Sequence, residues 1–377
     1  MKKRKAFEKP NAFLSNFAST NTIKPMKKKF NQLLCFFLLS GLLLIVFSCH
    51  EKQTISDSSF CQSMTPGQYI LPAPDGWWHW CMAPIYDNSG KLHVFMSAIP
   101  NSGSWNNNSK IVHYIADAPE GPYEFVDTTF SSNVATYHNP QISKVGDTYV
   151  MVFLWKLASV SGINQSIGIA TAKSLNGPWQ ESPYNPIIQP SYNEGDANAL
   201  HASNPTFLVD KDGKFRIYYK SISDQYLPEQ IREISLAISD NIEGPYENYA
   251  GNPLISYAEQ GLDVEDPYAF YYNGMYYMIV EDRMGVKNAL EGNPIPKDEI
   301  KEGGNRPGLI YTSADGINWG VPEVGYQTNQ YYFGDELART ERPHILWKDG
   351  KPECLFLACH DKDPSAGFFL RINDWKP

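Results

Sequence analysis

The sequence has few charged residues, and the charges are unevenly divided along the chain. Asp, Glu, Lys and Arg together make up 19% of the 377 residues. Residues 1–48 hold nine basic residues and one acidic residue, so residues 49–377 hold 23 basic and 40 acidic residues, a net charge of −17. A protein this acidic is repelled by phosphate backbones and by anionic membrane surfaces. Nucleic acid is therefore excluded as a partner, and a neutral substrate is favoured.

Helical periodicity, paired cysteines and long apolar runs are also scarce. Almost no segment repeats apolar residues every three to four positions, which argues against a helical protein. Outside the N-terminal region the cysteines are Cys61, Cys81, Cys354 and Cys359, with no spacing typical of a metal site. We expect buried free thiols there, although an oxidising compartment would permit disulfides. With 42% hydrophobic and 14% aromatic residues, the chain can nevertheless bury a large core.

The N-terminal region has the features of an export signal. Met26-Lys27-Lys28-Lys29 precedes an apolar run over residues 33–47, which is short for a full membrane span. The run ends in Val46-Phe47-Ser48-Cys49, which resembles a bacterial lipobox, where the cysteine is acylated and becomes the first mature residue. We therefore expect an N-terminal extension and lipoprotein signal peptide over 1–48 and a tether over 49–65. The protein would be exported and held by lipid on Cys49 at the periplasmic or cell-surface face of a bacterial membrane.

The rest of the sequence is a fivefold repeat. Each copy opens with an X-Pro dipeptide and a strand-like run, followed by a polar turn and a second β-branched or aromatic run. Turns such as Asn273-Gly274 and Asp349-Gly350 between apolar runs are strong hairpin signals. The opening dipeptides are Ala83-Pro84, Asn139-Pro140, Asn204-Pro205, Asp266-Pro267 and Arg342-Pro343.

A second hairpin follows in the first four copies, with turns such as Gly121-Pro122-Tyr123 and Gly177-Pro178-Trp179. Each copy thus predicts a four-stranded antiparallel sheet. Five such sheets around an axis make an all-β, five-bladed β-propeller, here over residues 66–377. The fifth copy ends at residues 368–372 without a fourth strand, and we expect residues 67–71 to supply that strand and close the ring.

The inner strands of a propeller line its central channel, so residues around each X-Pro should converge on one pocket. Carboxyl groups there suit glycosidic bond cleavage, which uses two of them, and aromatic faces stack on sugar rings. The candidate catalytic residues are Glu265, Asp266 and Glu341. The candidate substrate-binding residues are Trp78, His79, Trp80, His138, Asn139, His201, Asn204 and Arg342.

The five-bladed pattern, the X-Pro strand starts and the Gly-Pro-Trp/Tyr turns resemble glycoside hydrolase family 43 and its neighbour, family 117, over roughly residues 75–375. The family 43 pattern implies an Asp base before the first-blade Pro, a pKa-tuning Asp in the third blade and an acid Glu two residues before the fourth-blade Pro. Val264-Glu265-Asp266-Pro267 matches the last of these, so Glu265 inherits the acid role. The other two positions hold Ala83 and Asn204, which leaves Asp266, Glu341 or Asp75 as the base.

These features predict an exo-acting glycoside hydrolase that releases a terminal sugar from plant or algal cell-wall oligosaccharides. One alternative is a family 117-like anhydro-galactosidase with a histidine acid, for which His79, His138 and His201 are candidates. Another is a non-catalytic surface glycan-binding lipoprotein, since two expected carboxylates are missing. No cofactor is required for these activities. A channel-bound Ca²⁺, which some family 43 enzymes carry, is possible but is not predicted.

Overall fold

The computed structural model of the chain describes residues 54–72, 76–157, 164–300, 306–334, 339–359 and 365–377. The signal region, Cys49 and Asp75 lie outside these residues, so the predictions for them are not addressed by the structure. Among the described residues, no helix has the length and apolar character needed to cross a membrane.

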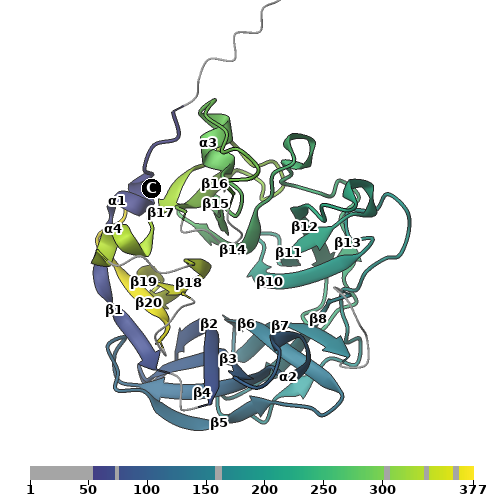
Figure 1. Cartoon of the computed structure of the whole chain (residues 1–377). Coiled ribbons are helices and arrows are strands. Elements are labelled where there is room, and N and C mark those ends of the chain that lie inside the picture. The colour runs from purple at the N-terminus through teal and green to yellow at the C-terminus, as the bar shows by residue number, and fades with distance from the viewer. Residues whose placement is uncertain (1–53, 73–75, 158–163, 301–305, 335–338, 360–364) are drawn as a thin grey trace, which may run out of the picture. The chain divides into compact units, whose positions relative to one another are not determined.

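Five four-stranded antiparallel sheets surround a common axis, as predicted (Figure 1). In Figure 1 the first strand of each repeat, β2, β6, β10, β14 and β18, lies nearest the centre, and these inner strands contact their neighbours around the ring. Blade 1 holds β2 (Trp77–Tyr86), β3 (Leu92–Pro100), β4 (Lys110–Ala116) and β5 (Glu124–Phe130). Blade 2 holds β6 (Ala135–Val145), β7 (Thr148–Leu157), β8 (Ser166–Ala172) and β9 (Gln180–Glu181). Blade 3 holds β10 (His201–Val209), β11 (Phe215–Ile222), β12 (Arg232–Ser239) and β13 (Glu247–Asn248). Blade 4 holds β14 (Glu265–Tyr272), β15 (Met275–Glu281), β16 (Gly308–Ser313) and β17 (Glu323–Tyr326). Blade 5 holds β18 (Glu341–Lys348), β19 (Lys351–Ala358), β20 (Ser365–Ile372) and β1 (Met64–Pro72).

The fifth blade confirms the predicted ring closure. Strand β1, from the N-terminal side of the propeller, pairs antiparallel with β20, the last strand of the chain. The residues before β1, which were expected to form part of the tether, also belong to this unit. Phe60, in α1 (Ser59–Gln62), is buried against Trp375, and Ser58 Oγ donates a hydrogen bond to the carbonyl oxygen of Val324. The propeller unit therefore begins before residue 66.

The tight turns follow the sequence signals. Asn273 and Gly274, between β14 and β15, both have positive φ (48° and 86°), and Asp349 and Gly350 repeat this between β18 and β19 (50° and 73°). Such turns match the twist of paired strands, which is why Asn-Gly and Asp-Gly are favoured there. Apart from α1, the short helices of the described residues lie in connections between strands: α2 (Trp105–Asn108), η1 (Asp224–Tyr226), η2 (Ala258–Gln260), α3 (Val286–Leu290) and α4 (Asn329–Phe333).

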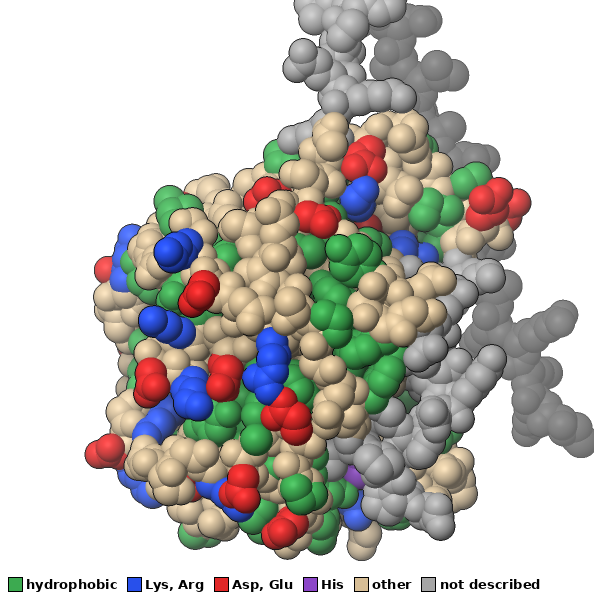
Figure 2. Space-filling view, turned by 90° about the vertical axis from the view of Figure 1, so that its left-hand side faces the viewer, with side chains coloured by type: hydrophobic (Ala, Val, Ile, Leu, Met, Phe, Trp, Pro, Cys, Tyr) green, Lys and Arg blue, Asp and Glu red, His purple; other side chains and the backbone are tan. Residues whose placement is uncertain are grey.

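The hydrophobic core lies between the blades, since each sheet face packs on the next sheet. Tyr268 and Phe270 of blade 4, for example, share one cluster with Ile345 and Leu355 of blade 5. Equivalent clusters fill the other four junctions between blades. On the outer face shown in Figure 2, acidic and basic side chains are intermixed over its described part. The polar groups of interest are therefore those at the axis.

Each inner strand carries a bulge, and one bulge corrects the sequence alignment. In blades 2–5 the extra residue is the one before proline, and it has positive φ: Asn139 (50°), Asn204 (52°), Asp266 (60°) and Arg342 (54°). In blade 1 the bulge lies between Trp80 and Ala83, and Cys81 has the positive φ (55°). Ala83-Pro84 was taken as the equivalent dipeptide, but it follows the bulge and pairs regularly with Phe95 and Val94. Cys81, not Ala83, therefore occupies the position where the family 43 pattern places its base.

Candidate active site

The five bulge residues form a hydrogen-bonded ring around the axis, here called the polar ring: Cys81, Asn139, Asn204, Asp266 and Arg342. Asn139 Nδ2 donates to Asn204 Oδ1 (2.8 Å), and Asn204 Nδ2 donates to Asp266 Oδ1 (2.6 Å). Arg342 Nη1 lies 3.0 Å from Asp266 Oδ1, and Arg342 Nε lies 3.2 Å from Cys81 Sγ. Cys81 Sγ completes the circuit by reaching the carbonyl oxygen of the residue after Asn139 (3.5 Å).

The polar ring is buried and its members bind one another. Asp266 and Arg342 are 2% and 3% exposed, and Asn139 and Asn204 are almost as buried. A buried ion pair with hydrogen bonds on both partners holds neighbouring elements in one arrangement. Asn139, Asn204 and Arg342 were predicted to bind substrate and Asp266 to act in catalysis. The structure gives all four a joining role between blades.

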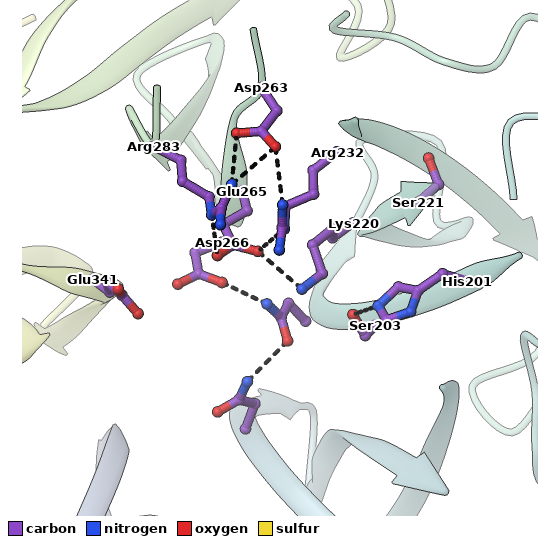
Figure 3. Close-up of polar contacts among 12 residues, drawn as sticks. His201, Ser203, Lys220, Ser221, Arg232, Asp263, Glu265, Asp266, Arg283 and Glu341 are labelled. Carbon is purple, nitrogen blue, oxygen red and sulfur yellow. Dashed lines mark hydrogen bonds and ion pairs between the residues drawn. The ribbon is translucent and has the colours of Figure 1, made fainter. Parts of the chain in front are cut away.

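The residues one position before the bulges form the next layer. In this layer Glu265 is surrounded by three cationic side chains (Figure 3). Its Oε2 is 2.9 Å from Lys220 Nζ and 3.1 Å from Arg232 Nε, and its Oε1 is 3.6 Å from Arg283 Nε. Burial alone would raise the pKa of Glu265, but the charges of Lys220, Arg232 and Arg283 outweigh it and hold the pKa well below its usual range. Glu265 is therefore ionised at neutral pH, the opposite of the state that a general acid requires.

A second carboxylate keeps the two guanidinium groups in place. Asp263, 1% exposed, accepts from Arg232 Nη1 (3.0 Å) and from Arg283 Nη1 (3.2 Å), as Figure 3 shows. Each arginine thus bridges Asp263 and Glu265, and this geometry restricts both side chains. The side chains of Glu265 (13% exposed) and Arg232 (22%) remain partly accessible.

Glu341 lies in a different environment. One carboxylate oxygen from each of Asp266, Glu281 and Glu341 lies within 4.8 Å of the others, and all three residues are buried. At that separation two unit charges repel by about 3.5 kcal/mol at an effective dielectric constant of 20. Burial and the charge of Asp266 raise the pKa of Glu341 from 4.5 to about 8, and Arg339, 3.3 Å away, only partly opposes them. Burial and the charges of Glu341, Glu265 and Asp266 raise the pKa of Glu281 well above its ordinary value.

Such a carboxyl cluster can be stabilised by protons or by a divalent cation. Among the described residues these three form the group whose oxygens come close enough to share a cation. The all-oxygen donor set suits a hard ion such as Ca²⁺, and Glu281 Oε2 is buried without a hydrogen-bond partner in the described part of the chain. Against a cation, Asp266 already accepts from Asn204 and Arg342.

The protonated form of the cluster predicts a pH dependence of stability, which is measured in a chelator so that no divalent cation is bound. With no divalent cation bound, the folded chain holds a proton on Glu341 that the unfolded chain releases above pH 4.5. The free energy of unfolding should therefore fall as pH rises from about 4.5 to about 8. In Glu341→Gln this fall should be less steep by about 1.4 kcal/mol per pH unit, which is the contribution of one proton. Urea unfolding of both proteins across this pH range, in EDTA, measures it, and equal slopes would contradict the protonation of Glu341.

The predicted histidines are buried, and two are held neutral. His138 Nδ1 lies 2.8 Å from Ser109 Oγ, and its ring stacks on Trp105. Burial and the charges of Arg342 and Lys220 lower the pKa of His138 to about 3, while burial and Lys110 lower that of His79 to about 4. Neither carries an imidazolium proton at neutral pH. His201 Nε2 lies 2.6 Å from Ser203 Oγ, as Figure 3 shows.

The predicted tryptophans differ in how far they reach solvent. Trp78, on β2, is 45% exposed, whereas Trp80, the blade 1 residue of the same layer as Glu265, is half-buried. Sequence reasoning missed Trp105, in α2, which is 39% exposed and stacks on His138. An exposed aromatic face beside a buried polar group is the arrangement that sugar rings stack on.

Sequence reasoning missed Lys220 and did not count Glu281 among the candidate site residues, although a signal for both was present. The residue before each bulge pairs with a residue in the second half of the next strand of the hairpin. Ser203 pairs with Lys220, and Glu265 pairs with Glu281. Counting outward from each tight turn, with one bulge allowed, would have placed Glu281 beside Glu265 and Lys220 at the equivalent position of blade 3.

Comparisons with known proteins agree with this architecture. The chain is 24% identical over 252 residues, 62% of its length, to the extracellular endo-α-(1→5)-L-arabinanase 2 of Bacillus subtilis. The match covers 47% of that protein, so the chain spans about half the length of the curated relative. Zg3597, a family 117 glycoside hydrolase of the marine bacterium Zobellia galactanivorans, superposes with a TM-score of 0.58 and 15% identity, over 84% of this chain and 91% of that one.

A thermostable family 43 glycoside hydrolase superposes with a TM-score of 0.55 and 14% identity, over 81% of this chain and 91% of that one. The chain has the fold of the family 43 and family 117 glycoside hydrolases. No protein-family model matches the sequence. At these identities the propeller is shared, while the site has to be judged from its own residues. In this propeller Cys81 and Asn204 stand where the family 43 pattern has its base and its pKa-tuning Asp.

Proposed function

We propose that the chain is a glycoside hydrolase that removes a terminal sugar from plant or algal cell-wall oligosaccharides. The observation that carries the proposal is that Glu265 and Glu341 hold equivalent positions before the bulges of blades 4 and 5 in opposite environments: three cations surround Glu265 and lower its pKa, whereas burial and nearby carboxyl groups raise that of Glu341. Hydrolysis of a glycosidic bond needs one ionised and one protonated carboxyl group. The named activity of the Bacillus subtilis relative, an arabinanase, supports the same class of reaction.

The proposed roles differ from the expectation from the sequence, in which Glu265 is the acid and Glu341 is one of three candidate bases. Glu341 donates its proton to the glycosidic oxygen as the bond to the anomeric carbon breaks. Glu265 supplies the negative charge that stabilises the developing positive charge at that carbon, and it accepts a proton from the attacking water. The proton that Glu265 takes from the water then passes to Glu341, which restores the resting state of both carboxyl groups, and the net reaction adds one water. Trp78 and Trp105 would form the wall on which the sugar stacks.

Product analysis tests the proposal. The protein without residues 1–49 is incubated with linear α-(1→5)-arabinan, agar oligosaccharides and other cell-wall glycans, and the products are read by mass spectrometry. A hydrated monosaccharide as the first product supports exo-hydrolysis. A ladder of longer fragments would establish endo-hydrolysis, the mode that the relative's name describes. An unsaturated product, or retention of a glycan without cleavage, would overturn the proposed reaction and favour elimination or a binding protein.

The two carboxyl roles can be separated by the leaving group. An aryl glycoside with an acidic phenol leaves without protonation, so Glu341→Gln should retain most of its activity on it and lose about 10²–10⁴-fold on an oligosaccharide. Glu265→Gln should lose about a thousandfold in activity on both substrates. If Glu265→Gln alone keeps the aryl activity, Glu265 is the acid, as the resemblance implies. A larger loss in His138→Gln or His201→Gln than in either glutamate variant would favour a histidine acid.

No step of this proposal uses a metal ion or cofactor, since both proton transfers are made by side chains. We also propose that the protein is exported and lipid-anchored through Cys49. Replacing Cys49 by serine should move it from the membrane fraction to the soluble fraction of the exported material. Membrane association unchanged by this substitution would contradict the anchor.

A further inference from the structure

A hollow on blade 3 is lined by residues that do not belong to the polar ring. It has a volume of about 310 Å³, and the residues that line it come from the β11–β12 connection, from β12 itself and from the chain segments on either side of blade 3. We call it the blade 3 cavity. The lining residues on which the argument rests are Ser223, Tyr226, Glu233, Asn252, Ser256 and Gln260.

One wall of the cavity is held in place by hydrogen bonds. The backbone N–H of Gly195 donates to Asp224 Oδ1 (3.0 Å), and Gln225 Nε2 donates to the carbonyl oxygen of Gly195 (2.9 Å). These bonds join η1 to the segment that leads into blade 3. Tyr226, the last residue of η1, therefore stands on a fixed turn. A wall that is already ordered loses little entropy when a ligand binds to it.

Glu233 is the buried polar group of the cavity. It is 2% exposed, and Ser256 is its hydrogen-bonding side-chain partner. Burial raises the pKa of Glu233 above 4.5, against the effect of Ser256. Burial of a carboxyl group disfavours its charged form. Its oxygens accept hydrogen bonds from hydroxyl groups, such as those of a sugar.

The chemistry of the lining selects for a neutral ligand. The described residues that line the cavity include two acidic residues, Glu233 and Glu259, and no Lys or Arg. An anionic sugar would be repelled. Hydroxyl groups and side-chain amides supply donors and acceptors on several sides, and Tyr226 adds an aromatic ring. The polar groups suit the hydroxyl groups of a sugar ring, and the aromatic ring suits its C–H face.

The cavity is joined to the active site through the same two strands. Lys220, on β11, and Arg232, on β12, bind Glu265. Glu233 follows Arg232 directly and lines the cavity. Because successive side chains of a strand point to opposite faces, Arg232 and Glu233 serve different sites from adjacent positions. The axis site and the cavity thus take adjacent residues of β12, in blade 3.

We propose that the blade 3 cavity is a second glycan-binding site, which takes a neutral sugar residue from a more distant part of the same polysaccharide. The identity of that polysaccharide rests on the proposed function. The site would raise affinity for long chains without taking part in bond cleavage, because two linked contacts bind more tightly than either alone.

Tyr226→Ala and Gln260→Ala test the site, with Tyr271→Ala as the matched control. Tyr271 is an exposed tyrosine on β14 and does not line the cavity. Affinity electrophoresis in gels that contain linear arabinan or agarose measures binding, and kcat/KM is measured on a trisaccharide. We expect each cavity variant to bind the polymer at least fivefold more weakly, with trisaccharide turnover unchanged. Glu233→Gln, which has a neutral hydrogen-bonding group, should bind normally, whereas Glu233→Lys should not.

The outcomes separate this inference from the proposed function. Binding that depends on Tyr226, without hydrolysis, would support the second site and overturn the hydrolase. Hydrolysis with polymer binding equal in Tyr226→Ala and Tyr271→Ala would overturn the second site alone. If neither arabinan nor agarose in the gel slows the migration of the protein, the second site is also overturned.

Discussion

Glu265→Gln should reduce kcat/KM by about a thousandfold and the free energy of unfolding by about 3–5 kcal/mol. Glutamine has the shape of glutamate without its charge. The substitution removes the ionised partner of the proposed reaction and leaves Lys220, Arg232 and Arg283 with Asp263 as the remaining carboxylate of the group. Uncompensated cations in a largely buried site destabilise the folded state, because water cannot replace the lost carboxylate. Urea unfolding and turnover on the substrate found by product analysis measure both effects.

Two further variants make this prediction specific. Glu247→Gln, at an exposed glutamate on β13, should change stability by less than about 0.5 kcal/mol. Glu265→Gln combined with Lys220→Met should recover part of the lost stability, because it removes one unpaired cation, but it should recover none of the activity. If Glu265→Gln matches the wild type in stability, the three cations do not depend on Glu265 and its low pKa needs another cause.

Arg342→Met should destabilise the protein by about 3–5 kcal/mol without any contact with substrate. Arg342 is the one cation of the polar ring, and its loss leaves Asp266, 2% exposed, with Asn204 and the backbone N–H of residue 342 as its partners among the described residues. The same change removes the link to Cys81, which connects blade 5 to blade 1. Thermal and urea unfolding measure the effect.

The double variant Asp266→Asn/Arg342→Met is the control. When both members of a buried ion pair are replaced together, no charge is left unpaired, and stability often returns. We therefore expect the double variant to be more stable than either single one. A double variant whose loss equals the sum of the two single losses would show that Asp266 and Arg342 act independently, against the ring described here.

The repeat predicted most of the fold because its signals are local. Asn273-Gly274 and Asp349-Gly350 can adopt the positive φ that tight hairpins need, and this fixed the strand pairs around them. Ring closure was predictable because the fifth repeat was one strand short. The position of the bulge in blade 1 was not predictable, because this bulge holds Cys81-Met82 and lacks the proline that marks the bulge in the other blades. A bulge is set by strand pairing, which a proline signal indicates only where proline is present.

The site was less predictable because its properties depend on neighbours from other strands. The resemblance implied that Glu265 is the acid, but its protonation state is decided by Lys220, Arg232 and Arg283, which lie far from it in sequence. The raised pKa of Glu341 likewise depends on Asp266 and on burial between two blades. The sequence identified Glu265, Asp266 and Glu341 as carboxyl groups of the site, whereas Glu281, Asp263 and the charges around each carboxyl group required the structure.

The pairing of β1 with β20 also constrains the order in which the molecule can form. The two strands belong to opposite ends of the propeller sequence, so this contact has nearly the largest loop to close and the greatest entropic cost. A chain emerging from a ribosome or an export channel can complete blades 1–4 from local hairpins. Its last blade waits for residues 365–372, and until they arrive β1 presents an unpaired edge to any other strand. The edge of β1 is therefore protected from pairing with other chains only once the eight residues of β20 have bound to it.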